Sequence, residues 1–184
     1  MTNGIQFAWK KDEYYTPPLL VEPLLQYIPP GSTIWCPFDT ADSEYVRILQ
    51  QSFTVVRGHI NEGKDFFEYQ PDNWDILISN PPFSRKLEVL ERCYSFGKPF
   101  ALLLGLPILN YQEVGNFFLN RPLQLLIFDK KVSFDGGTSA FNSSYFCWNF
   151  LPKDLSFHHL PHNNTGKHYL GAHLYNAKRE ADGI

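Results

Sequence analysis

The residues best suited to chemistry form a short turn, Asn80-Pro81-Pro82-Phe83, which follows the apolar run Ile76-Leu77-Ile78. Neither proline has a backbone N–H to donate, and each holds the preceding residue extended, so the sequence predicts a rigid turn at the end of a buried strand. The Asn80 side-chain oxygen and the Pro81 carbonyl oxygen could accept hydrogen bonds from one amino group, while the Phe83 ring offers a flat face for a base. A stiff loop without chemistry is the alternative.

Two such acceptors would solve a specific chemical problem. The exocyclic amino group of an aromatic base is a poor nucleophile, because its lone pair is delocalised into the ring. Oxygen acceptors aimed at its N–H groups favour the pyramidal amine, in which the lone pair is available for attack. Because the prolines fix the turn, little reorganisation is needed during a reaction. The turn therefore predicts a site that activates an amino group.

Apolar runs and turn residues alternate along the chain and predict the elements around this turn. Strands are expected at residues 33–38, 53–56, 66–67, 75–79, 100–104, 123–128 and 144–150. Two helices are expected between Pro18 and Pro29 and from Ser84 to Phe96. Two more are expected to start at a cap, one at Asp42 or Ser43 and one at a capping box of Asn110 with Glu113. Because strand and helix alternate, we predict an α/β fold with a doubly wound, mainly parallel sheet.

Candidate site residues fall where these strands end. Asp39 follows the first strand, the segment 59–65 follows the second, and Asn80 follows the strand at 75–79. In a doubly wound sheet, ligands bind beyond the carboxyl ends of the strands, near the point where strand order reverses. We therefore expect these three segments to meet at one edge of the sheet.

The segment from Asp75 to Phe83 resembles the catalytic motif of amino-methyltransferases that modify adenine N6. Further segments resemble other motifs of the same family in the expected order, namely 12–17, 35–39, 63–67 and 144–148. More broadly, the chain is similar to small phage-type proteins of the DNA N6-adenine methyltransferase kind, over about residues 12 to 155. The resemblance implies a Rossmann-like, class I methyltransferase-like fold with an antiparallel C-terminal strand.

The resemblance also implies a cofactor, S-adenosyl-L-methionine, and an acceptor, adenine in DNA or, second to it, RNA. The cofactor-binding residues would be Tyr15, Thr16, Pro17, Pro37, Phe38, Asp39, His59, Asp65, Phe66 and Asn80. Asp65 would accept a hydrogen bond from the cofactor adenine, Phe66 would pack on that ring, and Asp39 would accept from the cofactor ammonium. The catalytic residues would be Asn80, Pro81, Pro82 and Phe83. The aromatic candidates for stacking are Tyr15, Phe83, Tyr145 and Trp148.

Several positions depart from the family pattern. Thr40 and Asp42 stand where two glycines are typical, and Cys36 stands where an acid is typical. His59 replaces an acidic residue that would hold the ribose hydroxyls. Because glycine lets the backbone approach a ligand closely, these changes leave open a degenerate methyltransferase fold that serves as a cofactor-binding, inhibitory or interaction module. Methylation of RNA or of protein glutamine is a further alternative.

Composition sets the remaining expectations. The chain of 184 residues suits one domain, expected at 1–162 and followed by a polar tail at 163–184. A net charge of −3 argues against tight, sequence-independent DNA binding by a monomer. A target would have to be read by loops at 105–116 and 129–143, or by a surface that a homodimer enlarges.

The remaining predictions concern cellular location, the cysteines and metal binding. No apolar run approaches the ~20 residues that cross a bilayer, and the N-terminus lacks a signal-peptide pattern, so we expect a cytoplasmic protein without membrane contacts. Cys36, Cys93 and Cys147 are expected to be free, buried thiols. The C-terminal histidines match no zinc signature, and we expect no metal.

Overall fold

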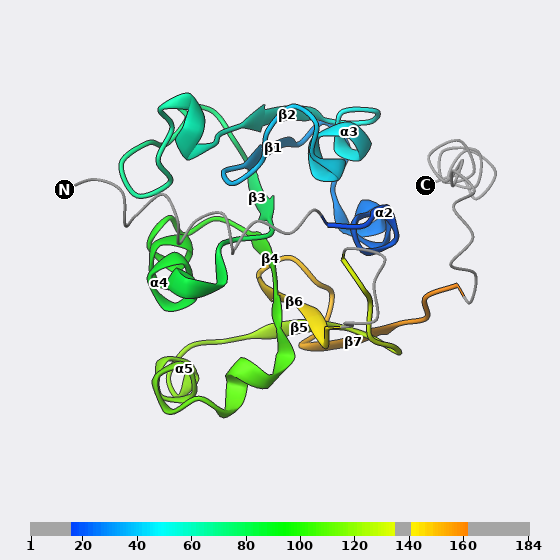
Figure 1. The fold of residues 1–184 in the computed structure, drawn as a ribbon, viewed down its shortest axis with the longest axis vertical. Helices are drawn as coiled ribbons and strands as arrows, with labels where there is room; N and C mark the ends of the chain where they lie inside the picture. The colour runs from blue at the N-terminus through cyan, green and yellow to red at the C-terminus, as the bar shows by residue number, and fades with distance from the viewer. Residues whose placement is uncertain (1–15, 135–140, 162–184) are drawn as a thin grey trace.

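The computed structural model describes residues 16–134 and 141–161, and its centre is a single seven-stranded sheet (Figure 1). The strands are β1 (Thr33–Cys36), β2 (Thr54–Arg57), β3 (Ile76–Ser79), β4 (Phe100–Gly105), β5 (Gln124–Phe128), β6 (Ser143–Trp148) and β7 (Leu155–His158). Their order in the sheet is β2-β1-β3-β4-β6-β5-β7. Only β6 runs antiparallel to its neighbours among these strands, and the other pairs are parallel.

The central strands are apolar on both faces because both faces are covered. Successive residues of β3 alternate between two hydrophobic clusters, with Ile76 and Ile78 in one and Leu77 in the other. β1 alternates in the same way, with Ile34 on the first side and Trp35 on the second. An unbroken apolar run is typical of a strand buried between two layers of helices.

The helices divide between these two faces (Figure 1). One face carries α2 (Pro18–Val21), the 3-10 helix η1 (Glu22–Tyr27) and α3 (Glu44–Leu49). The opposite face carries α4 (Lys86–Ser95) and α5 (Gln112–Phe118). Three further 3-10 turns follow strands, namely η2 (Ile60–Glu62), η3 (Phe83–Arg85) and η4 (Leu106–Asn110). The prediction of an α/β fold with a mostly parallel sheet is confirmed.

The prediction and the structure differ at two places in the list of strands. Residues 66–67 lie in a turn, because the Asp65 carboxylate accepts from the Phe67 backbone N–H at 2.9 Å and the Asp65 carbonyl accepts from Glu68 and Tyr69. The strand β7 was not predicted, and it pairs in parallel with β5 at the edge of the sheet. The last strand that the sequence predicts, at 144–150, corresponds to β6, which is antiparallel to both of its neighbours as expected.

The helix starts also differ. Ser84 lies inside η3, and α4 begins after Arg85 without a side-chain cap. Asn110 ends η4, and α5 begins after Tyr111 without the predicted capping box. The expected helix before Pro29 is split into α2 and η1. Ser43, in contrast, caps α3 as predicted, and its hydroxyl accepts from the Val46 N–H at 3.3 Å.

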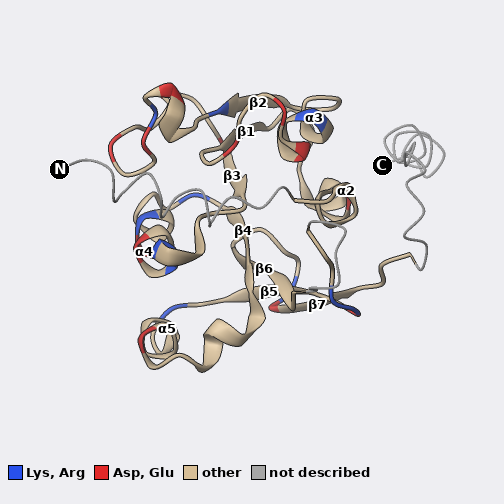
Figure 2. Cartoon of the chain, in the orientation of Figure 1, with Lys and Arg blue, Asp and Glu red and all other residues tan. Residues whose placement is uncertain are grey.

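Charged side chains lie on the loops, the helices and the outer strand β2, while the other six strands carry no Lys, Arg, Asp or Glu (Figure 2). Cys36, Cys93 and Cys147 are buried as predicted, and burial raises the pKa of each thiol. Within the described residues, no helix combines the length and the apolar character needed to cross a membrane.

Candidate active site

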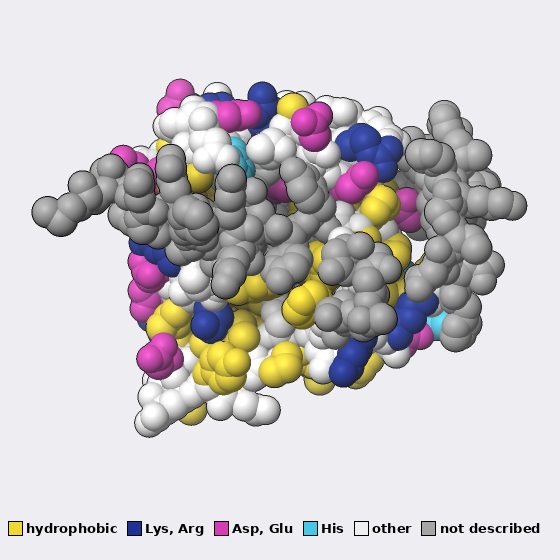
Figure 3. Space-filling view, in the orientation of Figure 1, with side chains coloured by type: hydrophobic (Ala, Val, Ile, Leu, Met, Phe, Trp, Pro, Cys, Tyr) yellow, Lys and Arg dark blue, Asp and Glu magenta, His cyan; other side chains and the backbone are white. Residues whose placement is uncertain are grey.

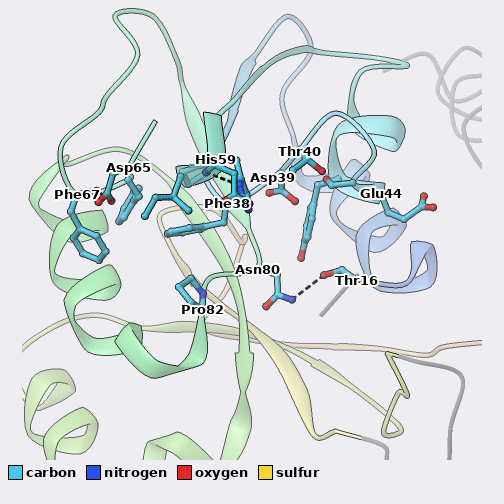
Figure 4. Close-up of a pocket in the computed structure, with 16 residues that line it drawn as sticks. Thr16, Phe38, Asp39, Thr40, Glu44, His59, Asp65, Phe67, Asn80 and Pro82 are labelled. Carbon is cyan, nitrogen blue, oxygen red and sulfur yellow. Dashed lines mark hydrogen bonds between the residues drawn. The ribbon is translucent and has the colours of Figure 1, made fainter. Parts of the chain in front are cut away.

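A pocket with a volume of about 220 Å³ opens beyond the carboxyl ends of β1, β2 and β3 (Figure 4). Eight residues predicted to bind a cofactor line it, namely Thr16, Pro37, Phe38, Asp39, His59, Asp65, Phe66 and Asn80. Pro82 of the Asn80 turn lines it too. The structure therefore gathers segments that are distant in sequence at the predicted edge of the sheet.

Backbone hydrogen bonds fix the floor of this pocket. The Gly58 N–H donates to the Cys36 carbonyl at 2.9 Å, and the Asp39 N–H donates to the Gly58 carbonyl at 3.0 Å. These bonds continue the parallel pairing of β1 and β2 beyond the last strand residues, Cys36 and Arg57. The loops after both strands consequently leave the sheet side by side.

One end of the pocket is acidic. Asp39 and Thr40 lie side by side in Figure 4, and the Asp39 carboxylate accepts a hydrogen bond from the Ser79 hydroxyl. Glu44 also lines the pocket, but its carboxylate points away from Asp39 and is paired with Arg47. Burial raises the pKa of Asp39 from 3.8 to about 6, against the opposing effect of the hydroxyls of Ser79 and Ser43. A buried carboxylate held by neutral hydroxyls is well placed to attract a cation.

The other end of the pocket is aromatic. Asp65 and Phe67 lie there in Figure 4, and Phe66 joins them in the lining. The Phe66 ring is 4.8 Å from the Phe38 ring between centroids, and the Arg85 guanidinium lies 3.6 Å from the Phe67 ring centroid. This end therefore offers flat apolar surfaces beside a carboxylate.

His59 lies between the two ends and is almost fully buried. Its Nδ1 atom accepts a hydrogen bond from the Asn61 N–H at 3.2 Å, as the cap of η2. When the ring is neutral, the proton is therefore on Nε2, which makes that atom a donor. The loop continues through Gly63, whose φ of 73° is the left-handed conformation that favours glycine.

Asn80 occupies the margin of the pocket nearest to Thr16. Its Nδ2 atom donates to the Thr16 hydroxyl at 3.1 Å. In Figure 4 the amide nitrogen points toward Thr16 and the amide oxygen points away from it. Ser79, which precedes Asn80, is the residue that hydrogen-bonds Asp39, so the turn and the acidic end share one strand terminus.

Several predicted site residues lie elsewhere. Tyr15 is outside the described residues. Pro17 precedes α2 as its N-cap and does not line the pocket. Pro81 is buried and does not line the pocket, and Phe83 packs against the hydrophobic cluster of α4 and α5. The roles given to Pro81 and Phe83 stay predictions.

The prediction of a stacking role is wrong for two of the aromatic residues. The Tyr145 side chain is fully buried, and its hydroxyl is 2.8 Å from the Tyr45 hydroxyl. Trp148 pairs with Phe100 at the first residue of β4, which is the opposite edge of the sheet from the pocket. The antiparallel direction of β6 explains this position, because its carboxyl end lies where its neighbours begin.

Sequence reasoning did not identify every lining residue. The missed ones are Thr40, Ser43, Glu44, Tyr45, Ile60, Asn61 and Phe67. Thr40, Ile60 and Asn61 follow Asp39 or His59 directly, so for them proximity to a strand end was the available signal. Tyr45 gave no such signal, because its spacing with Ile48 and Leu49 predicts a core residue of a helix. Thr40, at a position typical of glycine in the resembled family, points into the pocket region, whereas Asp42 is exposed.

Comparisons with known proteins add no further identification. No family model and no curated protein matches the chain. Within residues 16–134 and 141–161, no group of three or more His, Cys, Asp or Glu side chains is arranged to hold a metal ion.

Proposed function

We propose that this protein transfers a methyl group from S-adenosyl-L-methionine to the N6 amine of adenine in nucleic acid, with DNA the favoured substrate. The observation that carries the proposal is the layout of the pocket. An acidic end at Asp39 and an aromatic end at Asp65 and Phe66 lie at the carboxyl ends of parallel strands, with Asn80 at the margin. The single reversed strand β6 in an otherwise parallel sheet is also consistent with a class I methyltransferase-like fold.

The residues present fit this cofactor. When bound, the cofactor supplies an activated methyl group on a positively charged sulfonium. Asp39 would hold the ammonium group, because its buried carboxylate has neutral hydroxyl partners at Ser79 and Ser43. The His59 Nε2–H would donate to the ribose hydroxyls. Asp65 and Phe66 would hold the adenine through its amine and its ring face.

Asn80 would act on the substrate and not on the cofactor alone. Its side-chain oxygen would accept from an N–H of the target amine, which frees the amine lone pair for attack. Pro82 stiffens the turn that carries Asn80, so the acceptor needs little reorganisation. Much of the rate would then come from the position of the amine relative to the methyl donor.

A methyl-incorporation assay tests this proposal directly. Purified protein would be incubated with tritiated S-adenosyl-L-methionine and, separately, with single-stranded DNA, duplex DNA, RNA and a protein mixture. We expect label in DNA, found on adenine N6 after nucleoside digestion. Label only in protein glutamine or in RNA would reassign the substrate, and no label in any of them would contradict the enzyme proposal.

The aromatic end gives a prediction for cofactor affinity. Asp65→Asn keeps an oxygen that can accept from the Phe67 N–H, but it loses the charge that would bind the cofactor amine. We expect the dissociation constant for S-adenosyl-L-methionine, measured by calorimetry, to rise about ten-fold or more. Turnover at saturating cofactor should change little. The exposed Asp72→Asn serves as the control, and equal affinity of the Asp65 and Asp72 variants would contradict the assignment.

A substrate surface is proposed next to the Asn80 turn. Lys86 begins α4 directly after η3, and its Nζ atom lies 5.4 Å from the ring centroid of Tyr111, a residue that is 54% exposed. Figure 3 shows hydrophobic side chains gathered over the region of α4, α5 and β6, with basic side chains beside them. A lysine and an exposed ring can serve a phosphate and a base of single-stranded or extruded nucleic acid.

This surface can be tested by binding. Lys86→Ala and Tyr111→Ala should each weaken binding of a fluorescent single-stranded oligonucleotide by about ten-fold, measured by anisotropy at several salt concentrations. Only Lys86→Ala should reduce the slope of log affinity against log salt, by about one. Phe157→Ala, which removes an exposed ring from β7, is the control. Unchanged affinity in both test variants would remove this surface from the proposal.

A second candidate function is a cofactor-binding or interaction module without catalysis. Thr40 favours it, because a side chain lines the pocket at a position where the resembled family has glycine. A thermal shift with S-adenosyl-L-methionine, combined with no transfer to any acceptor, would support the module.

A further inference from the structure

A stacked pair of side chains joins the aromatic end of the pocket to the segment that follows the Asn80 turn. The guanidinium of Arg85 lies 3.6 Å from the ring centroid of Phe67, which is a van der Waals separation. Phe67 belongs to the loop after β2 and lines the pocket, whereas Arg85 ends η3, the 3-10 turn after β3. Since β1 lies between β2 and β3 in the sheet, strand pairing does not join these two loops. The stack therefore bridges two segments that are not neighbours in the sheet.

Glu88 fixes the plane of the Arg85 guanidinium. The Arg85 Nε–H donates to the Glu88 carboxylate at 3.1 Å, and Nη2 pairs with the same carboxylate. A guanidinium donates hydrogen bonds in its own plane, so its faces stay available for stacking on a ring. The carboxylate therefore orients the group, and the Phe67 ring lies against it.

The Arg85–Glu88 pair is placed where it adds little to stability. The two side chains are 33% and 53% exposed, and water screens the attraction between charges in such a setting. A guanidinium over a ring, in contrast, fixes where the ring lies, because the contact requires one particular geometry. The consequence of this arrangement is therefore the position of Phe67.

Phe67 is the part of the aromatic end whose position depends on this contact. Phe66 is already fixed by the core, because it is 2% exposed and its ring centroid lies 5.5 Å from that of Trp35. Phe67 is half-buried, and its ring lies edge-on to that of Phe66 with 5.3 Å between centroids. The Phe67 N–H donates to the Asp65 carboxylate at 2.9 Å, so a shift of Phe67 would also disturb Asp65.

We propose that Arg85 is a positioning residue of the binding site: its guanidinium, oriented by Glu88, holds the Phe67 ring as a wall of the pocket and keeps Asp65 in place to bind a purine. The inference rests on the proposed function for the identity of that ligand, the adenine end of S-adenosyl-L-methionine. The position of the ring is independent of any reaction. The same contact links the loop that would hold the purine to the segment that follows Asn80.

A ligand that carries only the purine end of the cofactor tests this role. Arg85→Ala should raise the Kd for 5′-methylthioadenosine, measured by calorimetry, about five-fold, the effect of one partly exposed cation–π contact. Phe67→Leu should raise the Kd at least as much. Adding Arg85→Ala to Phe67→Leu should cause no further loss, because Arg85 acts through the ring. Arg85→Lys keeps the charge but not the planar group, so it should resemble Arg85→Ala.

The chain offers a matched control for these variants. The Arg121 guanidinium lies 4.2 Å from the ring centroid of Phe117, and neither residue lines the pocket. Arg121→Ala removes an equivalent contact and should leave the affinity unchanged. Equal affinity of Arg85→Ala and the unmodified protein, full affinity in Arg85→Lys, or a further loss in the double variant would overturn the inference.

A measurement without ligand distinguishes positioning from a general loss of stability. The amides of Phe67 and Tyr69 both donate to Asp65. In ¹⁵N-labelled Arg85→Ala, they should exchange with solvent about five-fold faster, because one contact that holds their loop is lost. The amide of Asp39, at the floor of the pocket, should keep its rate. Faster exchange of Asp39 together with a lower Tm would replace the positioning role with a structural one.

The outcomes separate this inference from the proposed function. If the unmodified protein binds neither S-adenosyl-L-methionine nor 5′-methylthioadenosine, the proposed function fails, and amide exchange still decides whether Arg85 holds the loop. If the protein transfers methyl groups but Phe67 exchanges at the same rate in Arg85→Ala, the proposed function stands and the role of Arg85 is refuted.

Discussion

Asn80→Ala should lower methyl transfer at least ~10²-fold while the protein keeps its fold, because loss of one preorganised acceptor of developing charge typically costs that much. The side chain is half-buried at the pocket margin, outside the two hydrophobic clusters, and its amide nitrogen donates to the Thr16 hydroxyl at 3.1 Å. Its truncation should therefore change the free energy of unfolding far less than the rate. Rates would be measured with saturating cofactor and compared with circular dichroism and Tm.

Two further variants make this prediction specific. Asn73→Ala truncates an exposed asparagine in the loop before β3 and should keep full activity. Asn80→Asp keeps oxygen acceptors on both arms, and the Thr16 hydroxyl can donate to one of them, so this variant should retain more activity than Asn80→Ala. Equal turnover in Asn80→Ala and the unmodified protein would refute the acceptor role.

Asp39→Asn should produce the second large effect, with opposite signs on stability and on cofactor binding. The rise in the pKa of Asp39 from 3.8 to about 6 corresponds to a penalty of about 3 kcal/mol on the ionised form in the folded protein. The variant has no charge to bury, so its free energy of unfolding at pH 7.5 should exceed that of the unmodified protein. Its affinity for a cationic ligand should fall at the same pH.

The pH dependence of this effect has a definite sign. Because the pKa of folded Asp39 is above its unfolded value, the folded protein binds the proton more tightly. The contribution of Asp39 to stability is therefore fully present below about pH 4, falls as pH rises toward about 6, and is lost above it. The stability gain of Asp39→Asn should follow the same curve in reverse, small near pH 4 and largest above pH 6.

Calorimetry can connect this titration to the ligand. The affinity of the unmodified protein for S-adenosyl-L-methionine should increase between pH 5 and pH 7, as Asp39 ionises around pH 6, and Asp39→Asn should lose this dependence. S-adenosylhomocysteine lacks the sulfonium charge but keeps the ammonium, so it should show the same pH dependence if Asp39 holds the ammonium. Asp42→Asn, an exposed neighbour, is the control. A pH-independent affinity of the unmodified protein would contradict this role of Asp39.

The parts of the fold that the sequence predicts well are those that local chemistry determines. The run Ile76-Leu77-Ile78 is buried on both faces, and the prolines after Asn80 end it sharply, so its position and its partners at the sheet edge follow from residue types. Ser43 is likewise recognisable because its hydroxyl caps α3 directly. Where a structural feature depends only on residues that are close in the chain, the residue types are enough to predict it.

The parts that the sequence does not predict depend on distant contacts or on weak local signals. β7 is an edge strand whose Leu155 and Phe157 are exposed, so its pattern does not indicate burial. α4 and α5 begin without side-chain caps. The helix starts that were predicted from Ser84 and Asn110 are therefore wrong. The Tyr45–Tyr145 hydrogen bond joins residues 100 positions apart, and no periodicity within a helix could reveal it.

The reversed direction of β6 also determines where the protein tolerates added sequence. β5 ends and β6 begins at the carboxyl edge of the sheet, where Ser143 pairs with Gly105 and the Leu106 N–H donates to the Asn142 carbonyl at 2.7 Å. The connection between them is closed by the pairing of Val132 with Phe141. A module grafted between those two residues would emerge at the edge of the sheet that also carries the pocket, and every strand should keep its partners. The architecture thus offers an insertion point on the same edge of the sheet as the candidate site.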